Sequence, residues 1–508
     1  MGQTGKVWLI GAGPGSSELL TVKAKRLIET GECIVYDRLI GMEILSMLPA
    51  GARLIDVGKS PGYHAVPQGE INRILVREAK LGRKVIRLKG GDPFLFGRGG
   101  EEVEALCEEG IPFEVVPGVS SCIAVPAYNG IPVTHRDYVS GVHIITGHHR
   151  EDGNGKVDYE ALVRAKGTLV FLMGVGALKE ITDNLMRAGM KADMPAAILQ
   201  QGTTADQRRI TATVGTLTEE AGKQQIKPPS IIIVGEVAGL AEKFSWYERL
   251  PLAGERILVT RPAERGFKLQ EALRSLGAEV LTVPVIKTVP VGDSVRVGRI
   301  ERELRRIQEY QVLVFTSPYG VERFFEILPE TGMDIRHVLH MRFAVIGEGT
   351  AAALRDKGIR ADYMPGQYDG ASLGRLLADT LSDGTGILLA RSSIGSREIL
   401  EEIGKNPALS CTDLAIYDTI FQEGQKERLR LFMEEGNITK VIFTSSSSVE
   451  GFLSLLGEFP YETVNAVCMG QKTEQTAKAA GMRTSKARNA TIEELVHQCM
   501  NSNDVRMK

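Results

Sequence analysis

A glycine-rich turn near the start of the chain is the first feature whose composition could bind a ligand. Gly11-Ala12-Gly13-Pro14-Gly15 follows a strand-like run at 6–10 and precedes an amphipathic helix expected over 18–29. Bare backbone N–H groups beside a helix N-terminus can hold an anionic or nucleotide ligand. Asp37 follows about 20 residues later at the end of a second strand, where dinucleotide-binding folds keep the acid that contacts the ribose.

Two residues of this turn argue against a dinucleotide. The third glycine of the fingerprint would fall at position 16, which is Ser16, and Pro14 stiffens the turn. An NAD-linked oxidoreductase therefore stays an alternative hypothesis, which binding of reduced nicotinamide would support.

The second half of the chain repeats a different feature, a strand that ends in small hydroxyl residues before a helix. It occurs at Thr316-Ser317 and again at Thr444-Ser445-Ser446-Ser447. Hydroxyls and backbone N–H groups at such strand ends can bind carboxylates without burying a cation. The alternative is that these serines only cap the helices that follow them.

Apolar strands and amphipathic helices alternate through the first half. Strand-like runs are expected at 34–36, 85–88, 113–116, 142–145 and 169–172, and helices at 68–81 and 98–109. Short apolar strands between helices indicate an α/β fold with a largely parallel sheet. The segment around Trp246 breaks this rhythm, which predicts one domain over 1–246, a linker over 247–254 and a second domain over 255–508.

The second domain contains an internal repeat. Residues 312–322 match 441–450, residues 344–350 match 466–473, and residues 256–261 match 386–391. A repeat of this length predicts two similar α/β lobes rather than a solenoid of short units. Ligands commonly bind between two such lobes.

Several motifs of the first half occur together in a particular order. They are Val35-Tyr36-Asp37-Arg38-Leu39, Val57-Gly58-Lys59, Leu88-Lys89-Gly90-Gly91-Asp92-Pro93-Phe94-Leu95-Phe96-Gly97-Arg98-Gly99, Val116-Pro117-Gly118-Val119-Ser120-Ser121 and Gly130-Ile131-Pro132-Val133-Thr134-His135-Arg136. Over about residues 5–245 the chain resembles the uroporphyrinogen-III C-methyltransferase family, which makes precorrin-2 from S-adenosylmethionine and uroporphyrinogen III. The resemblance implies two domains with the active site between them, and a homodimer.

The resemblance also assigns roles to residues. It makes Asp37 the proton acceptor and Lys59 the proton donor, as suits a methyl transfer in which the ring must lose a proton. The alternative for Asp37 is a helix or turn cap. The implied contacts to S-adenosylmethionine are Pro14, Gly90, Gly91, Asp92, Leu95, Ser120, Ser121, Met173 and Gly202. Ser120-Ser121 stands where the family is expected to have Thr-Ala.

The implied substrate is a polycarboxylate, and basic residues surround the same motifs. The candidate substrate-binding residues are Arg87, Lys89, Arg98, His135 and Arg136. Arginine can pair with a carboxylate through two hydrogen bonds, which would suit this substrate. The alternative for Arg87 and Lys89 is that they flank a strand and solvate its ends.

A second resemblance covers about residues 255–500. Its motifs are Ile257-Leu258-Val259-Thr260-Arg261-Pro262, Phe315-Thr316-Ser317, Ile346-Gly347, Arg391–Glu398, Ile416-Tyr417-Asp418-Thr419, Phe443–Ser447 and Met469–Thr473. In this order they resemble the uroporphyrinogen-III synthase family, which closes hydroxymethylbilane with inversion of its last ring and loss of water, without a cofactor. The fold implied has lobes at 255–288 plus 420–508 and at 289–419, with the chain crossing near Val289 and returning near Thr419.

In this second family Tyr417 matches the functional tyrosine, whose phenol would assist departure of the hydroxyl. The alternative is a buried tyrosine that joins the lobes. Substrate contacts are expected from Thr316, Ser317, Thr444, Ser445, Ser447, Gly470 and Thr473.

The overall composition excludes some classes of partner. The 508 residues carry 61 Lys plus Arg against 63 Asp plus Glu, a net charge of −2, so no basic excess favours nucleic acid or an anionic membrane. No signal peptide and no apolar run of about 18 residues is evident. Six scattered cysteines, without a C-x-x-C pair, predict a reducing cytoplasm and no metal site, and adjacent His148-His149 is expected in an exposed loop.

The two resemblances support each other because the product of one half is the substrate of the other. The sequence therefore predicts a bifunctional transferase and lyase of sirohaem or cobalamin synthesis. Two further alternatives are a methyltransferase acting on a later corrin intermediate and a C-terminal half that only binds or delivers tetrapyrrole.

Overall fold

The computed structural model describes residues 4–58, 66–147, 157–261 and 263–501, apart from the side chains of residues 263–265. The chain divides into two compact units. The first comprises Met1–Val259, Phe267–Val283 and Glu427–Lys440, and the second comprises Thr260–Gly266, Pro284–Lys426 and Val441–Lys508. Lys59, His148 and His149 lie outside the described residues.

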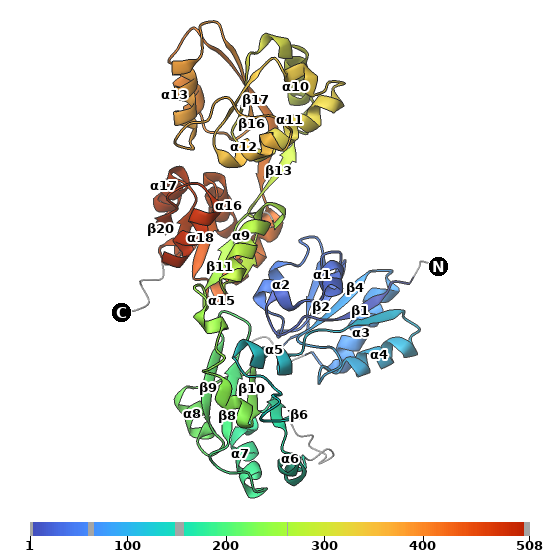
Figure 1. Ribbon diagram of the computed structural model, residues 1–508. Coiled ribbons are helices and arrows are strands. Elements are labelled where there is room, and N and C mark those ends of the chain that lie inside the picture. The colour runs from blue at the N-terminus through green and yellow to red at the C-terminus, as the bar shows by residue number, and fades with distance from the viewer. Residues whose placement is uncertain (1–3, 59–65, 148–156, 262, 502–508) are drawn as a thin grey trace. The chain divides into compact units, whose positions relative to one another are not determined.

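The N-terminal sheet is parallel throughout and has the strand order β3-β2-β4-β1-β5 (Figure 1). Its strands are β1 (Val7–Gly11), β2 (Cys33–Tyr36), β3 (Arg53–Asp56), β4 (Val85–Lys89) and β5 (Phe113–Val116). The strands expected at 6–10, 34–36, 85–88 and 113–116 are confirmed to within one residue at each end.

Helices cover both faces of this sheet. Helices α3 (Gln68–Lys80) and α4 (Gly99–Glu108) pack on the face that carries Val35 and Val85. Helices α1 (Val22–Ile28) and α2 (Met42–Ser46) pack on the face that carries Ile34 and Ile86. Burial on both faces explains why the parallel strands are apolar without alternation.

The helix expected over 18–29 is divided. A 3-10 turn, η1 (Ser17–Leu19), precedes α1, which begins after Thr21. The Thr21 hydroxyl accepts a hydrogen bond from the Ala24 N–H at 3.2 Å, and this N-cap starts a new helix.

The second sheet has the order β6-β7-β10-β8-β9. Its strands are β6 (Val142–Thr146), β7 (Thr168–Leu172), β8 (Pro195–Gln200), β9 (Arg208–Thr213) and β10 (Ser230–Val234). Only β6 and β7 pair in parallel, whereas β10 is antiparallel to β7 and β8, and β8 is antiparallel to β9. A short connection between β8 and β9 permits a hairpin, so the parallel pairing expected from the sequence holds for the first sheet and not for this one. The accompanying helices are α5 (Ser121–Tyr128), α6 (Tyr159–Ala165), α7 (Leu178–Arg187) and α8 (Leu217–Lys223).

The predicted linker contains a 3-10 turn, η4 (Tyr247–Arg249). The Tyr128 ring lies 5.1 Å from the Trp246 ring and 4.9 Å from the Tyr247 ring. Beyond the linker, β11 (Arg256–Val259) pairs in parallel with β12 (Glu279–Thr282), and α9 (Ala263–Ser275) connects them. Helix α15 (Lys426–Glu435) belongs to the same unit.

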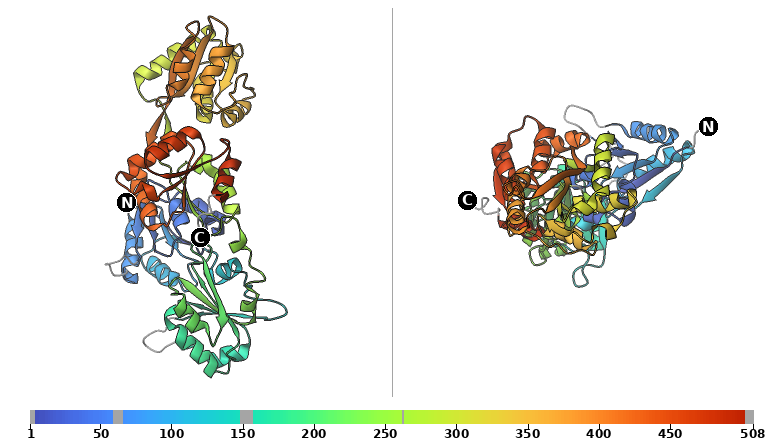
Figure 2. Two further views of the ribbon diagram at one scale, coloured as in Figure 1. Left: turned by 90° about the vertical axis from the view of Figure 1, so that its left-hand side faces the viewer. Right: turned by 90° about the horizontal axis from the view of Figure 1, so that it is seen from above.

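The largest sheet of the second unit has the order β13-β17-β16-β14-β15. Its strands are β13 (Ile286–Pro290), β14 (Val312–Phe315), β15 (Arg342–Val345), β16 (Gly386–Ser392) and β17 (Ser410–Phe421). The helices of this segment are α10 (Ser294–Arg305), α11 (Pro318–Glu330), α12 (Glu348–Arg355), α13 (Gly370–Thr380) and α14 (Glu398–Ile403). The left-hand view of Figure 2 shows these helices, coloured yellow to orange, grouped around the sheet. Strand β13 is antiparallel to β17, with Val289 opposite Asp418 and Thr288 opposite Thr419, so the two segments predicted to link the lobes lie side by side.

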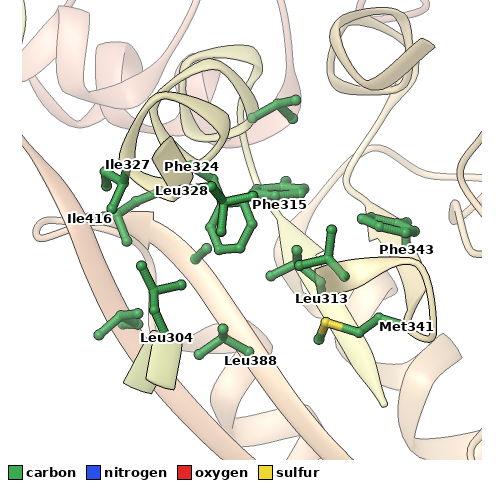
Figure 3. Close-up of a cluster of buried hydrophobic side chains, with 14 of the residues drawn as sticks. Leu304, Leu313, Phe315, Phe324, Ile327, Leu328, Met341, Phe343, Leu388 and Ile416 are labelled. Carbon is green, nitrogen blue, oxygen red and sulfur yellow. The ribbon is translucent and has the colours of Figure 1, made fainter. Parts of the chain in front are cut away.

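A buried apolar cluster holds this segment together (Figure 3). Leu313 and Phe315 of β14 meet Phe324 and Leu328 of α11, and all four side chains are at most 1 % exposed. The Phe315 and Phe324 rings are 5.4 Å apart in an edge-to-face arrangement. Tyr417 belongs to the same cluster, so this core fixes the position of the predicted functional tyrosine.

The predicted repeat is confirmed by the remaining elements. They are β18 (Lys440–Phe443), α16 (Ser446–Leu456), β19 (Asn465–Cys468), α17 (Gln471–Ala479), β20 (Arg483–Lys486) and α18 (Ile492–Asn501). The order β14, α11, β15, α12 recurs as β18, α16, β19, α17, and each pair of strands is parallel. Ser317 and Ser445 occupy equivalent N-caps, with φ −158° at both and ψ of 154° and 158°.

Within the described residues, none of the helices combines the length and the apolar character needed to cross a membrane.

Candidate functional site

The loops that follow β1 and β4 are hydrogen-bonded to each other. The Gly91 N–H donates to the Gly13 carbonyl at 2.7 Å, and the Gly13 N–H donates to the Gly91 carbonyl at 3.2 Å. A Cβ at Gly11 would lie 2.5 Å from the Gly118 nitrogen, so the loop after β5 also meets them backbone to backbone. This close approach places Pro14, Gly90 and Gly91 at the carboxyl edge of the sheet, where ligands of α/β folds commonly bind.

Gly91 leaves room for a ligand at this edge. Its φ is +66°, and a Cβ built there would have only the Ser121 nitrogen, at 3.8 Å, within 4 Å. The open side of Gly91 therefore faces the N-terminal turn of α5, where backbone N–H groups are available to an anionic group. We call this space beside Gly91 the cradle at Gly91.

The Asp92 side chain accepts hydrogen bonds from the backbone of its own loop, after β4, and of the loop after β5. Its Oδ1 accepts the Phe94 N–H at 2.9 Å, and its Oδ2 accepts the Gly118 N–H at 3.1 Å. Leu95 is partly buried against the core of the second sheet. Asp92 thus fixes the backbone of the loops after β4 and β5, and Leu95 packs the first of these loops against the second sheet.

The other predicted cofactor residues come from the second sheet and α5. Ser120 is the N-cap residue of α5, and its Oγ lies 3.1 Å from the Cys122 Sγ. Met173 follows β7 with φ +56° and a 55 % exposed side chain. Gly202 follows β8, where a Cβ would collide with Val125. The Ser16 N–H donates to the Thr203 hydroxyl at 3.3 Å, which joins the turn after β1 to the loop around Gly202.

Asp37 lies at the end of β2 with its side chain 26 % exposed. Its Oδ1 accepts the Leu39 N–H at 3.1 Å, and its Oδ2 lies 3.4 Å from Nη2 of Arg87. The turn-cap interaction occupies Oδ1 and leaves Oδ2 beside Arg87. Lys59, the predicted proton donor, lies outside the described residues, so its distance from Asp37 is not defined.

Arg87 and Lys89 are buried, being 3 % and 4 % exposed. Each donates to Oε1 of Glu102 at 2.9 Å. The sequence predicted either contact with substrate carboxylates or solvated strand ends, and the structure directs both cations to a buried carboxylate instead. Burial, followed by the charge of Arg87, lowers the pKa of Lys89 from its ordinary value.

The three remaining basic candidates are more accessible. Arg98 has φ +56° and a 58 % exposed side chain that pairs with Glu101 through two contacts of 2.7 Å. His135 packs edge-on against Tyr138, with the ring centroids 4.8 Å apart, and Arg136 is exposed. Because these side chains are at least partly exposed, a polycarboxylate in solution can contact them without any rearrangement of the core.

Tyr417 in the second unit contacts Ser317, in the hydroxyl-bearing segment that follows β14. Its hydroxyl lies 2.8 Å from Ser317 Oγ, and its ring packs edge-on against Tyr319 at 4.8 Å. Ser317 also accepts the Gly320 N–H at 3.0 Å as the N-cap of α11. The neighbouring Thr316 is partly buried at the end of β14.

The equivalent segment after β18 has the same kind of N-cap, in which Ser445 caps α16 and two further serines take part. Ser445 Oγ accepts the Ser448 N–H at 3.2 Å and lies 3.0 Å from Ser447 Oγ. Thr444 is partly buried just before it. Gly470 is the N-cap residue of α17 and provides no side-chain cap, and Thr473 in the first turn of α17 is 5 % exposed. Capping is therefore satisfied at both strand ends.

Some ionic partners were not evident in the sequence. Glu102 lies on α4, 15 residues from Arg87 in the chain. Arg296 pairs with Asp418 through contacts of 2.8 and 2.9 Å, and the hydrogen bonds from Arg296 and Ser393 lower the pKa of Asp418. No local spacing signals these pairs, because the partners come from different elements. In the part of the chain that the structure describes, no group of three or more His, Cys, Asp or Glu side chains is arranged to hold a metal ion.

Two family models match successive parts of the chain. The model of the Tetrapyrrole (Corrin/Porphyrin) Methylases matches residues 6–218, and that of Uroporphyrinogen-III synthase HemD matches residues 268–497. The chain is thus a bifunctional α/β enzyme of the tetrapyrrole class, with a methyltransferase half and a uroporphyrinogen-III synthase half.

The porphyrin biosynthesis protein HemD of Ruminiclostridium josui is 41 % identical over 496 residues, covering 98 % of each chain, and this chain belongs to the same family. The siroheme synthase of Salmonella schwarzengrund (strain CVM19633) is 49 % identical over 243 residues, or 48 % of this chain and 52 % of that one. The chain thus spans about half the length of this second relative. A crystal structure of uroporphyrin-III C-methyl transferase from Thermus thermophilus, complexed with S-adenyl homocysteine, is 41 % identical and has a TM-score of 0.40, covering 46 % of this chain and 99 % of that one.

Proposed function

We propose that the two halves catalyse consecutive reactions. Residues 255–508 close hydroxymethylbilane to uroporphyrinogen III, with inversion of the last ring and loss of water. Residues 1–246 then transfer two methyl groups from S-adenosylmethionine to that product and give precorrin-2. The observation that carries the proposal is the presence of both family matches in one chain, since the product of one family is the substrate of the other.

In the methyltransferase half, the backbone around Gly91 and the start of α5 hold S-adenosylmethionine. Support comes from the open side of Gly91, 3.8 Å from the Ser121 nitrogen, because a cofactor with a carboxylate needs backbone donors at close range. The cofactor supplies an electrophilic methyl group. As the new carbon–carbon bond forms, the carbon–sulfur bond breaks and one proton leaves the tetrapyrrole.

Asp37 accepts that proton, and Lys59 serves as the proton donor. A carboxylate at the edge of the site, 26 % exposed, can reach both solvent and substrate. Arg98, His135 and Arg136 bind substrate carboxylates, for which two-point arginine contacts suit both charge and shape.

In the synthase half, Tyr417 assists the departure of the terminal hydroxyl, and the strand ends at Ser317 and Ser445 bind substrate carboxylates. Support comes from the 2.8 Å contact between Ser317 and Tyr417, which brings a phenol to one of these strand ends. Most of the acceleration comes from holding the linear substrate in the bent geometry of ring closure. This half uses neither a metal ion nor a cofactor, and the whole chain acts as a cytoplasmic homodimer joined through the methyltransferase half.

The test is a single-vessel assay of the purified chain with freshly generated hydroxymethylbilane, with and without S-adenosylmethionine. The expected products are the type III isomer without the methyl donor and dimethylated product with it. Type I isomer alone, which forms spontaneously, would refute the synthase activity. Supplied uroporphyrinogen III then tests the methyltransferase half separately, and absence of methylation would refute that half of the proposal.

A further inference from the structure

A buried ionic cluster lies beneath the end of β2, next to Asp37. Arg87 and Lys89 are two residues apart on β4, so both side chains point to the same sheet face as Val85, which α3 and α4 cover. Glu102 comes from α4 and is fully buried. A strand and a helix thus bring two cations and one anion together inside a domain core.

Glu102 ties the two cations to each other. Its Oε1 accepts hydrogen bonds from Arg87 Nε at 2.9 Å, Lys89 Nζ at 2.9 Å and Gln68 Nε2 at 3.3 Å. Its Oε2 has no hydrogen-bond partner among the residues that the structure describes. An arrangement that leaves one buried oxygen unsatisfied is costly for a purely structural cluster, which points to a purpose beyond packing.

Each side of the Arg87 guanidinium has a partner. Nε donates to Glu102, Nη1 donates to the Leu88 carbonyl at 3.1 Å, and Nη2 donates to Asp37 Oδ2 at 3.4 Å. Because the other two nitrogens are engaged in the core, Nη2 has a fixed direction. Arg87 therefore directs its Nη2 donor at Asp37 from the core side of the sheet.

The two buried cations of the cluster need a second negative charge, which Asp37 provides. Glu102 alone cannot balance two buried cations, and an uncompensated buried charge is strongly unfavourable. Asp37 supplies the second negative charge. Its other oxygen accepts the Leu39 N–H at 3.1 Å, so the carboxylate is held at both oxygens.

We infer that Arg87 is a positioning residue for Asp37, and that Glu102 and Lys89 anchor Arg87 in the orientation this requires. The inference rests on the proposed role of Asp37 as proton acceptor. It replaces the expectation that Arg87 contacts substrate, because a side chain that is 3 % exposed and bonded at three nitrogens has no surface left for a dissolved carboxylate. Arg87 thereby keeps the carboxylate in one rotamer between substrate and core.

The test is a double-mutant cycle measured on methylation by the full chain. Arg87→Gln should lower kcat about 10-fold or more, with the KM for uroporphyrinogen III and the Kd for S-adenosylmethionine unchanged. Arg87→Lys, which keeps the charge, should restore part of kcat. In the Asp37→Asn background, Arg87→Gln should change the residual rate by less than about 2-fold, because the residue it positions is already gone.

Retained binding of S-adenosylmethionine reports whether the methyltransferase half of each variant is folded, and cyclisation of hydroxymethylbilane by the same molecules reports whether the synthase half is folded. Arg77→Gln is the matched control, since Arg77 pairs with Glu78 in the same domain without touching Asp37, and it should leave methylation unchanged. If Arg87→Gln does not fold, the same cycle is run with Arg87→Lys.

Equal losses from the Arg87 substitution with and without Asp37 would overturn the inference, as would a loss confined to cofactor binding. A wild-type chain that does not methylate uroporphyrinogen III would instead refute the proposed function, so the two failures are distinguishable.

Discussion

The Ser317 Oγ lies 2.8 Å from the Tyr417 hydroxyl and 3.0 Å from the Gly320 N–H, although Ser317 and Tyr417 are 100 residues apart in the chain. One serine hydroxyl thus caps α11 and contacts the phenol that the family resemblance makes functional. Capping and a role in the site are therefore compatible at this position. The hydroxyl can orient the phenol because its own position is fixed by the helix it caps.

Tyr417→Phe tests the phenol itself. We expect the rate of hydroxymethylbilane cyclisation to fall by about 10-fold, because a general acid contributes at least that much when it assists a leaving group. The ring stays in the core, so folding should be preserved. Tyr461→Phe is the control and should cyclise at the wild-type rate, because among the described residues the Tyr461 hydroxyl contacts the Gly457 carbonyl at 2.7 Å and the Leu453 carbonyl, and none of the proposed site residues. An unchanged rate for Tyr417→Phe would assign Tyr417 to packing.

Ser317→Ala separates the cap from the contact to Tyr417. Loss of an N-cap costs about 0.5–2 kcal/mol of stability, and the substitution should in addition slow cyclisation. Asp369→Ala removes a comparable cap, in which Asp369 Oδ1 accepts the Ser372 N–H at 2.7 Å, and should lower stability alone. Ser317→Thr keeps the hydroxyl and should restore both properties. Calorimetry and the isomer-resolved assay measure the two effects, and equal kinetics for the two alanine variants would contradict the prediction.

Asp37→Ala should lower methylation by about 100-fold or more, because the transfer loses its proton acceptor. Binding of S-adenosylmethionine should be largely retained, since the cradle at Gly91 involves other loops. Cyclisation by the second half should not change. Equilibrium dialysis and the two assays measure these quantities, and wild-type methylation by the variant would refute the assignment of the base.

Phe324→Ala should destabilise the segment from α10 to β17 by about 3–5 kcal/mol, because it empties the centre of a fully buried cluster. Phe324 is 1 % exposed and packs on Phe315 at 5.4 Å (Figure 3). Since Tyr417 belongs to the same cluster, cyclisation should be lost at a lower temperature while methylation persists. Activity measured after stepwise heating tests this, and parallel loss of both activities would contradict it.

Thiol reactivity should distinguish Cys107 from the other five cysteines. Cys107 is exposed, whereas burial raises the pKa of Cys33 to about 11 and those of Cys411 and Cys468 to about 12. A raised thiol pKa means that these groups stay protonated at pH 8 and react slowly, and reactivity should appear only as the pH rises toward those values. A coloured disulfide reagent at pH 8 should therefore titrate one thiol rapidly in the native chain and six after denaturation. Cys107→Ser should remove the rapid phase, and a rapid phase that remains would show that another cysteine is accessible.

Much of the architecture could be predicted from local patterns. The apolar runs predicted four strands of the first sheet to within one residue at each end, because strands buried on both faces leave a continuous apolar signal. The repeat was evident for a similar reason: Ser317 and Ser445 end equivalent strands and cap equivalent helices, and both roles depend on neighbouring residues only. The parallel pairing predicted for the second sheet was wrong for most of its strands, because an apolar run carries no information about which strand lies beside it or in which direction that strand runs.

The sequence by itself determined most strands of the first sheet and the repeat of the second half, and it placed Asp37 at the end of a strand, whereas Tyr417 was singled out by a family resemblance. Only the tertiary structure decided the environments of the charged groups. Arg87 and Lys89 sit in a strand pattern that is equally compatible with a surface edge, and their partner Glu102 lies on a helix whose packing brings it within 2.9 Å. The physical reason is that backbone periodicity is a local property, whereas the burial and pairing of a charge depend on which distant element covers it.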